Sequence, residues 1–143
     1  MDNRIYKWNG SGWNALPGSV RAKRVDVFSD NNPWIVATDG FVYQYSGGRW
    51  HKKGNFKARD IGMAENGTHI WALAESNGAV HKYELNGVWR KVPGGADHIS
   101  VDKDGTVWVV NRGRIIYRRD CIQAMTASPQ SSFVSVDDLG DDS

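Results

Sequence analysis

The chain has 143 residues, which is one domain's worth of sequence, and 40% of them are hydrophobic and 24% charged, as in a globular protein. No run of 18 apolar residues occurs, so the sequence excludes a transmembrane helix. The net charge of +2 is uneven: residues 1–120 hold all 18 basic and 12 of the 16 acidic residues, whereas 121–143 hold four acidic residues and no basic one. This pattern indicates either a solvated surface with a solubilising tail, or a basic body that prefers anionic partners and whose tail competes for the same surface.

Cys121 is the only cysteine, so no disulfide bond can form within the chain. The N-terminal residues lack the basic segment followed by an apolar core that marks a secretory signal. Both features predict a cytoplasmic protein, with a secreted protein as the alternative if a signal has been removed.

Short runs of alternating apolar and polar residues, separated by turn residues, predict antiparallel strands along the first 120 residues. Several predicted turns contain Asn-Gly or Asp-Gly, which readily adopt the positive φ that tight hairpins need. Loops are predicted over residues 19–24 and 54–59. In chain order, the first predicted strands cover residues 5–8, 13–16, 25–28, 34–37 and 41–45, and another strand is predicted to start at Trp50. The later predicted strands cover residues 61–63, 70–73, 80–83, 88–92, 99–101, 106–110 and 115–119.

Pairs of tryptophans recur along the chain at a nearly fixed period. The second member of each pair recurs every 37 residues, and the first at spacings of 37 and 39. The first members are Trp13, Trp50 and Trp89, and the second members are Trp34, Trp71 and Trp108. Such a period indicates a repeat architecture. We therefore predict that residues 1–120 form repeats over approximately 5–41, 42–79 and 80–119.

Residues 121–143 differ from the repeats, because they contain Ser and Pro and end in acidic residues. This composition predicts a tail that is either disordered or docked on a partner, with residues 133–136 as a candidate added strand.

The strands that carry the second tryptophan are apolar at consecutive positions, so both of their faces need cover. Four antiparallel strands in each repeat predict an all-β fold made of three four-stranded blades of a β-propeller, in which neighbouring blades provide that cover. The chain has no Trp-Asp dipeptide, and its period is shorter than that of kelch repeats, which disfavours those two propeller types.

Residues 86–111 contain Gly-x-Trp, Val-Pro-Gly, Ile-x-Val and Asp-Gly-x-Val-Trp-Val-Val-Asn, and this series resembles the tectonin repeat. The resemblance covers residues 5–119. The first repeat departs from it with Asn31-Asn32 in place of Asp-Gly, and the second with Lys53 in place of the proline. The resemblance implies β-propeller lectins and related scaffolds that bind glycans, bacterial lipopolysaccharide, or protein and phosphoinositide partners. It also implies about twice as many repeats as this chain has.

Three blades cannot close a ring, and they leave two apolar blade faces in water. Burial of apolar surface is worth roughly 25 cal/mol per Å², so two open faces of several hundred Å² each would forfeit on the order of 10 kcal/mol. That loss is comparable to the whole stability of a domain. We therefore predict that association completes the propeller to about six blades, either as a homodimer or in a heteromeric assembly.

The sequence shows no catalytic or metal-binding pattern. None of the four histidines has a second His or Cys at metal-ligand spacing, and no Gly-x-Ser-x-Gly or phosphate-binding loop occurs. Residues 102–105 resemble the start of a calcium loop, but Gly113 stands at the position of its last acidic ligand, which favours a hairpin turn. We predict a protein that is not an enzyme and uses no cofactor and no metal.

The two sets of tryptophans predict different roles. Trp34, Trp71 and Trp108 lie within apolar strands and are predicted to form the structural core. The turn-side tryptophans lie beside polar and basic residues, a combination that suits sugar rings and anionic headgroups, although they could equally pack between blades. The predicted ligand-binding residues are Trp13, Trp50, Trp89, His51, Lys52, Arg90 and Lys91.

Two functions follow from these patterns. The first is a lectin-like module that binds a glycan, a lipopolysaccharide-like ligand or another anionic surface ligand at repeated propeller sites. The second is a scaffold that uses the propeller faces and the tail to bind a protein partner. Nucleic-acid binding is disfavoured, because the repeats already account for the alternation of aromatic and basic residues.

Overall fold

The computed structural model describes residues 2–27, 32–64, 67, 69–119 and 133–136, and these residues form strands and turns with a single short 3-10 segment. No helix in this described part of the chain has the length and apolar character of a membrane span. The elements are β1 (Tyr6–Trp8), β2 (Trp13–Ala15), β3 (Ala22–Val27), β4 (Pro33–Ala37), β5 (Phe41–Ser46), β6 (Arg49–Met63), β7 (Ile70–Ala74), β8 (Ala79–Glu84), η1 (Leu85–Gly87), β9 (Val88–Gly95), β10 (His98–Val101), β11 (Val107–Val110), β12 (Ile116–Arg119) and β13 (Val134–Ser135).

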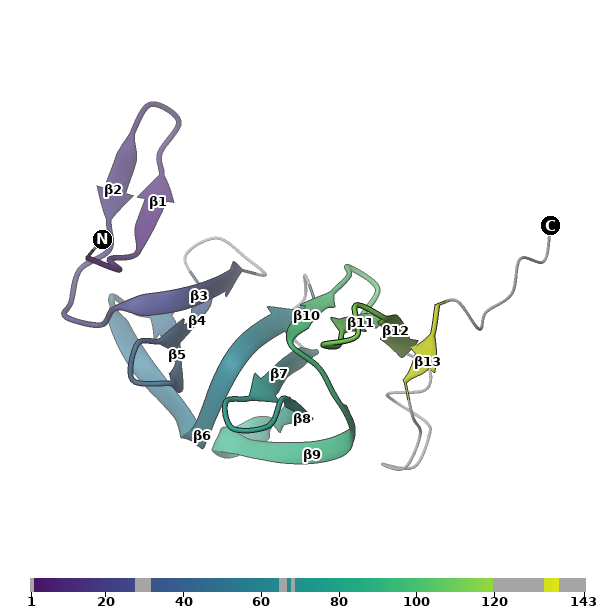
Figure 1. The fold of residues 1–143 in the computed structure, drawn as a ribbon. Coiled ribbons are helices and arrows are strands. Elements are labelled where there is room, and N and C mark those ends of the chain that lie inside the picture. The colour runs from purple at the N-terminus through teal and green to yellow at the C-terminus, as the bar shows by residue number, and fades with distance from the viewer. Residues whose placement is uncertain (1, 28–31, 65–66, 68, 120–132, 137–143) are drawn as a thin grey trace.

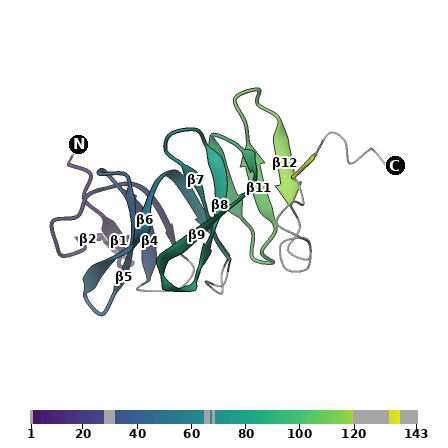
Figure 2. The same cartoon turned by 90° about the horizontal axis from the view of Figure 1, so that it is seen from below.

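The strands form three groups of four and one separate hairpin (Figures 1 and 2). Blade A consists of β3, β4, β5 and the first part of β6, and blade B consists of the second part of β6 with β7, β8 and β9. Blade C consists of β10, β11, β12 and β13. The N-terminal hairpin consists of β1 and β2. Neighbouring strands are antiparallel throughout, so the all-β propeller fold expected from the sequence is confirmed for this segment.

The strand β6 joins blades A and B without a break. Its first part pairs with β5 and its second part with β7, and the register shifts between residues 52 and 57 in the first pairing and between residues 58 and 60 in the second. The loop expected over residues 54–59 is therefore part of a strand. Gly54 explains the difference, because its φ of +78° and its lack of a side chain allow β6 to pass against the carbonyl of Gly87, where a Cβ would lie 2.2 Å from the oxygen.

The sequence repeats are out of phase with the blades. Each repeat begins with the two outer strands of one blade and continues with the two inner strands of the next, as in β5 and β6 followed by β7. Consecutive blades are therefore linked both by the shared repeat and by side-chain packing.

In blades A and B, a tryptophan in the second strand lies against the next blade. Trp34 of blade A packs in one cluster with Ile61, Met63 and Ile70 of blade B. One blade further on, Trp71 packs with Ile99, Val107 and Val109 of blade C. These contacts bury apolar side chains on both faces of blade B, which accounts for the consecutive apolar residues in β4 and β7.

Two aspartates on the inner strands tie neighbouring blades together. Oδ2 of Asp26 accepts a hydrogen bond from the backbone N–H of Met63 at 3.0 Å. Oδ2 of Asp60 accepts one from the backbone N–H of Ile99 at 2.9 Å. These bonds satisfy backbone donors on the inner strands of blades B and C, so they fix the register between blades.

We expect the substitution Trp71→Ala to lower the free energy of unfolding by about 3–5 kcal/mol, because the side chain is 0% exposed and its loss leaves a cavity. The matched control is Trp13→Ala, since Trp13 is 67% exposed. Urea denaturation of both variants measures the difference. Equal losses would show that Trp71 does not carry the contact between blades.

Burial raises the pKa of the Asp26 carboxyl above its ordinary value of 3.8, and the charge of Asp60 adds to the increase, while the N–H groups of Val27 and Met63 oppose it. The folded protein therefore binds this proton more tightly than the unfolded chain. The resulting stabilisation is complete below pH 3.8 and is lost as the pH rises through the higher folded-state pKa. An asparagine at this position does not ionise, so the free energy of unfolding of Asp26→Asn should not fall in this way as the pH rises. The free energy of unfolding of Asp26→Asn relative to that of wild type should therefore rise between pH 3.5 and pH 7.

Urea denaturation of Asp26→Asn and wild type at both pH values measures this difference, with Asp104→Asn at an exposed turn as the control. A difference between Asp26→Asn and wild type that stays constant with pH would contradict the expectation.

Candidate functional site

The turn-side tryptophans lie on the outer strands, each beside an aromatic residue of the neighbouring strand. The ring centroids are 5.3 Å apart for Trp8 and Trp13, 5.0 Å for Tyr45 and Trp50, and 5.0 Å for Tyr83 and Trp89. The backbone register pairs the same residues in all three cases. The set is thus structurally equivalent from one unit to the next.

Two of these tryptophans also pack against a glycine of the preceding unit. A Cβ on Gly18 would lie 3.4 Å from the Trp50 ring, and a Cβ on Gly54 would lie 3.1 Å from the Trp89 ring. The Nε1–H of Trp89 donates to the carbonyl of Lys53 at 2.8 Å. Trp50 and Trp89 therefore make contacts between neighbouring units, while Trp13 is the most exposed of the three.

The structure does not gather the predicted polar residues around these tryptophans. His51 lies 3.1 Å from the carbonyl of Ser46, and Lys52 lies over the Phe41 ring at 3.6 Å. Arg90 donates to Glu84 at 2.6 Å. Lys91 alone of the predicted set lines a groove between two blades. The ligand-binding role of these residues stays a prediction.

A groove of about 500 Å³ lies between blades A and B, and we call it the A–B groove. Phe56 lines the groove, with its ring centroid 5.0 Å from that of Trp89, on which it stacks, and 4.5 Å from that of His81, against which it is tilted. The other lining residues are polar or small: Asn55, Lys57, Ala74, Glu75, Ser76, Asn77, Ala79 and Lys91.

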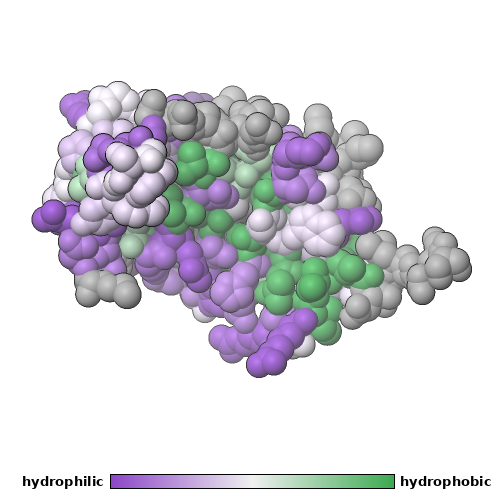
Figure 3. Space-filling model, turned by 90° about the horizontal axis from the view of Figure 1, so that it is seen from above, coloured by the Kyte–Doolittle hydropathy of each residue, from purple (hydrophilic) through white to green (hydrophobic). Residues whose placement is uncertain are grey.

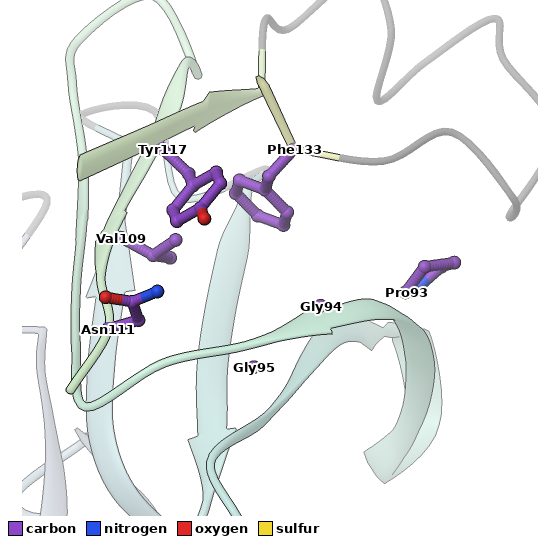
Figure 4. Close-up of a pocket in the computed structure, with 7 residues that line it drawn as sticks. All are labelled: Pro93, Gly94, Gly95, Val109, Asn111, Tyr117 and Phe133. Atoms are coloured by element: carbon purple, nitrogen blue, oxygen red, sulfur yellow. The ribbon is translucent and has the colours of Figure 1, made fainter. Parts of the chain in front are cut away.

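An equivalent cavity of about 260 Å³ lies between blades B and C, and we call it the B–C pocket (Figure 4). By backbone register, Gly94 lies where blade A has Phe56, and Tyr117 lies where blade B has His81. The Phe133 ring packs on Gly94, 3.2 Å from where a Cβ would lie, and the cavity lies beside the rings of Tyr117 and Phe133 (Figure 4). The pocket is lined by Pro93, Gly94, Gly95, Val109, Asn111, Tyr117 and Phe133.

The tail supplies the aromatic wall of this pocket. The strand β13 pairs antiparallel with β12, with Ser135 opposite Tyr117 and Val134 opposite Arg118. This register sets Phe133 opposite Arg119, the position that Trp50 and Trp89 hold in blades A and B. Phe133 also contacts a glycine as those tryptophans do, since a Cβ on Gly94 would lie 3.2 Å from its ring. Phe133 is therefore the turn-side aromatic residue of blade C.

Two polar groups line the pocket, Asn111 away from Phe133 and the hydroxyl of Tyr117 beside it (Figure 4). Oδ1 of Asn111 accepts a hydrogen bond from the N–H of Ile115 at 3.0 Å, which leaves its Nδ2 donor facing the cavity (Figure 4). The hydroxyl of Tyr117 is a second polar group at the wall. The site thus combines two aromatic rings, two glycines without side chains and polar groups that can fix the orientation of a ligand.

Sequence reasoning missed Asn111, Tyr117 and Phe133 as lining residues. A comparison of the repeats would not have found the first two, because the repeat motif aligns Gly94 with Gly54, and only the strand register sets Gly94 at the position of Phe56. Phe133 lies outside the repeats, and only the pairing of β13 with β12 brings it to the pocket. Among the residues that the structure describes, no group of three or more His, Cys, Asp or Glu could hold a metal ion.

Comparison with known sequences supports the tectonin resemblance. The chain is 43% identical over 56 residues to Tectonin-2 of Physarum polycephalum, a match that covers 38% of this chain and 15% of that protein. It is 39% identical over 61 residues to Tectonin-1 of the same organism, covering 42% of this chain and 27% of that protein. The matches span less than a third of these relatives, and no family model matches the chain. The chain therefore carries tectonin-like repeats over part of its length.

Solved structures with a similar fold share little sequence with this chain. A luciferin-regenerating enzyme has a TM-score of 0.62 at 16% identity, and the match covers 94% of this chain and 57% of that protein. YCF48 bound to D1 peptide has a TM-score of 0.58 at 13% identity, and the match covers 84% of this chain and 42% of YCF48. The WD40 β-propeller domain of Doa1 has a TM-score of 0.55 at 14% identity, and the match covers 74% of this chain and 40% of that domain. At these identities the likeness shows the fold alone.

We expect Gly94→Ala to lower the free energy of unfolding by about 1–2 kcal/mol or more. The φ of +125° is unfavourable for alanine, and the new methyl group would crowd the Phe133 ring. Gly10→Ala is the matched control, because Gly10 has a φ of +100° with open space around it. Urea denaturation compares the two. If Gly94→Ala costs no more than Gly10→Ala, Phe133 does not pack on Gly94.

Proposed function

We propose that this chain, whose repeats are tectonin-like, is a non-catalytic recognition module that binds a sugar ring of a glycan in the B–C pocket. The observation that carries the proposal is the open space beside Tyr117 and Phe133, where Gly94 replaces an aromatic residue. The C–H face of a sugar ring suits aromatic walls, and its hydroxyls suit a few polar groups. A cavity of about 260 Å³ has room for one such ring rather than an extended ligand.

The polar groups of the pocket favour a neutral sugar ring at this position. Nδ2 of Asn111 and the hydroxyl of Tyr117 can each bond one ring hydroxyl. No Lys or Arg is among the lining residues, so an anionic headgroup would lack a counter-charge there. The A–B groove differs, because Lys57 and Lys91 line it together with Glu75. A glycan with an anionic substituent, as in a lipopolysaccharide-like ligand, would use that groove instead.

A scaffold function is the second candidate, and the exposed aromatic residues of the N-terminal hairpin favour it. Tyr6, Trp8 and Trp13 are all exposed on one small hairpin. Exposed aromatic residues of this kind are common in protein interfaces. In this case the chain would associate with a protein partner, and the pocket would have no ligand.

Two conservative substitutions test the glycan site. Tyr117→Phe removes only a hydroxyl, and Asn111→Asp keeps the Oδ1 acceptor for Ile115 while removing the Nδ2 donor. We expect each to weaken binding about 2-fold to 10-fold, the effect of one hydrogen bond worth about 0.5–1.5 kcal/mol. A glycan array with wild type identifies a bound glycan, and calorimetry with that glycan compares the variants.

His81→Ala, at the equivalent position of the A–B groove, is the control and should leave this affinity unchanged. The proposal fails if no glycan on the array binds wild type, or if His81→Ala lowers the affinity while Tyr117→Phe and Asn111→Asp do not. Stable co-purification of a protein partner in the absence of glycan binding would support the scaffold function instead.

A further inference from the structure

The N-terminal hairpin is the outer half of a blade whose inner half is missing from the described residues. Its register, with Trp8 opposite Trp13, is that of the two outer strands of blades A and B. Figure 1 shows it beyond β3, on the side of blade A that faces away from blade B. Within the described chain β1 pairs with β2 alone, so its inner edge is open.

The face of blade A beside this gap is apolar and exposed. Val25 and Val27 are 58% and 51% exposed, whereas Ile61 and Met63, at the same positions of blade B, are 5% and 4% exposed. A cleft of about 290 Å³ lies between this face and the hairpin, and Figure 3 shows apolar surface in the same region. The missing contact is the one that Trp34 makes with Ile61 and Met63 inside the chain.

The far face of blade C has the complementary half of the same contact. Trp108 corresponds to Trp34, and Ile116 corresponds to Val42 of blade A by backbone register. Ile116 is 45% exposed and Val42 is 0% exposed. A second apolar area in Figure 3 lies toward blade C. The two ends of the chain therefore expose the two partners of one repeated contact.

The outer half of blade C resembles the N-terminal hairpin in sequence, but its strand pairing is shorter. The sequence Ile116-Tyr117-Arg118 of β12 matches Ile5-Tyr6-Lys7 around β1, but its partner strand β13 has only two residues. Arg119 holds the position of Trp8 and is buried, and its Nε and Nη1 have no hydrogen-bond partner among the described residues. Buried guanidinium nitrogens without hydrogen bonds are costly, although the Trp71 ring lies 5.5 Å from the Arg119 guanidinium, and an aromatic residue there would remove that cost.

We propose that a second copy of the chain completes the gap by strand exchange. The hairpin β1–β2 of one copy pairs with β11 of the other, in the place that β12 and β13 occupy within one chain. The composite blade then has inner strands β10 and β11 from one copy and outer strands from the next. The β11–β12 pairing that breaks is replaced by a β11–β1 pairing of the same kind, and β12 and β13 are displaced from the composite blade.

The exchange buries the exposed apolar residues at both ends of the chain. Trp108 of one copy lies on Val25 and Val27 of the other, as Trp34 lies on Ile61 and Met63 within the chain. Trp8 replaces the unpaired Arg119 over Trp71. Two reciprocal exchanges, together with blades A and B of each copy, give a six-bladed ring. In the composite blade Tyr6 and Trp13 replace Tyr117 and Phe133, so the comparison of Tyr117→Phe and Asn111→Asp reports on the closed chain and is made in the monomeric Val27→Asp background.

Disulfide trapping tests the exchange, with all variants made in a Cys121→Ser background. Val110 lies opposite Ile116 within the chain, and exchange sets it opposite Ile5 of the second copy. We expect Ile5→Cys and Val110→Cys proteins, refolded together and oxidised mildly, to form a covalent heterodimer. Ile5→Cys mixed with Lys103→Cys, on an exposed turn of blade C, measures random cross-linking. A double variant Val110→Cys/Ile116→Cys reports the closed, unexchanged chain.

The proposal is overturned if the double variant cross-links fully within one chain and the mixture gives no more heterodimer than the Lys103→Cys control. Light scattering gives an independent readout. We expect a particle of twice 16.0 kDa for wild type and a monomer for Val27→Asp, which sets a charge on the exposed face.

Val88→Asp is the matched control, since Val88 is exposed to a similar degree at the start of β9, and it should remain a dimer. A wild-type monomer at about 100 μM, or a dimer that persists in Val27→Asp with an unchanged unfolding transition, contradicts the exchange.

Discussion

The structure depends on one contact, in which a tryptophan of the second strand of a blade is buried against the inner strands of the next blade. Trp34 and Trp71 make this contact twice, and a basic side chain lies over each ring, Lys53 at 5.6 Å and Lys82 at 5.8 Å. A single blade cannot bury both faces of such a strand, so each blade requires a neighbour. The exposure of Val25, Val27 and Ile116 is the direct consequence at the two ends of the described chain.

A second repeated contact joins the outer strands, where an aromatic ring lies on a glycine of the preceding unit. Gly18 with Trp50, Gly54 with Trp89 and Gly94 with Phe133 form this series. The first two rings belong to the repeats, but Phe133 comes from a segment of different composition. The same backbone geometry thus accepts an aromatic residue from elsewhere in the chain, which is the physical basis for strand exchange at this position.

The candidate site arises from a local departure from the repeat rather than from the repeat itself. In the A–B groove Phe56 fills the space between His81 and Trp89. In the B–C pocket the residue at the corresponding register position is Gly94, on which the Phe133 ring packs, and a cavity lies beside it. Binding sites in repeat proteins can therefore be sought where one repeat has lost a side chain that its neighbours keep.

The all-β fold, the period and the need for neighbouring blades could be predicted from the amino-acid sequence, because turn residues and buried tryptophans are local features with a fixed spacing. It also identified residues 133–136 as a candidate added strand. Only the tertiary structure decided that Trp50 and Trp89 pack between neighbouring units, and that Phe133 joins Tyr117 and Asn111 at one pocket. Those contacts join residues far apart in the chain, and the pairing of β13 with β12 sets their register. No periodicity in the sequence encodes that pairing, since the tail lies outside the repeats.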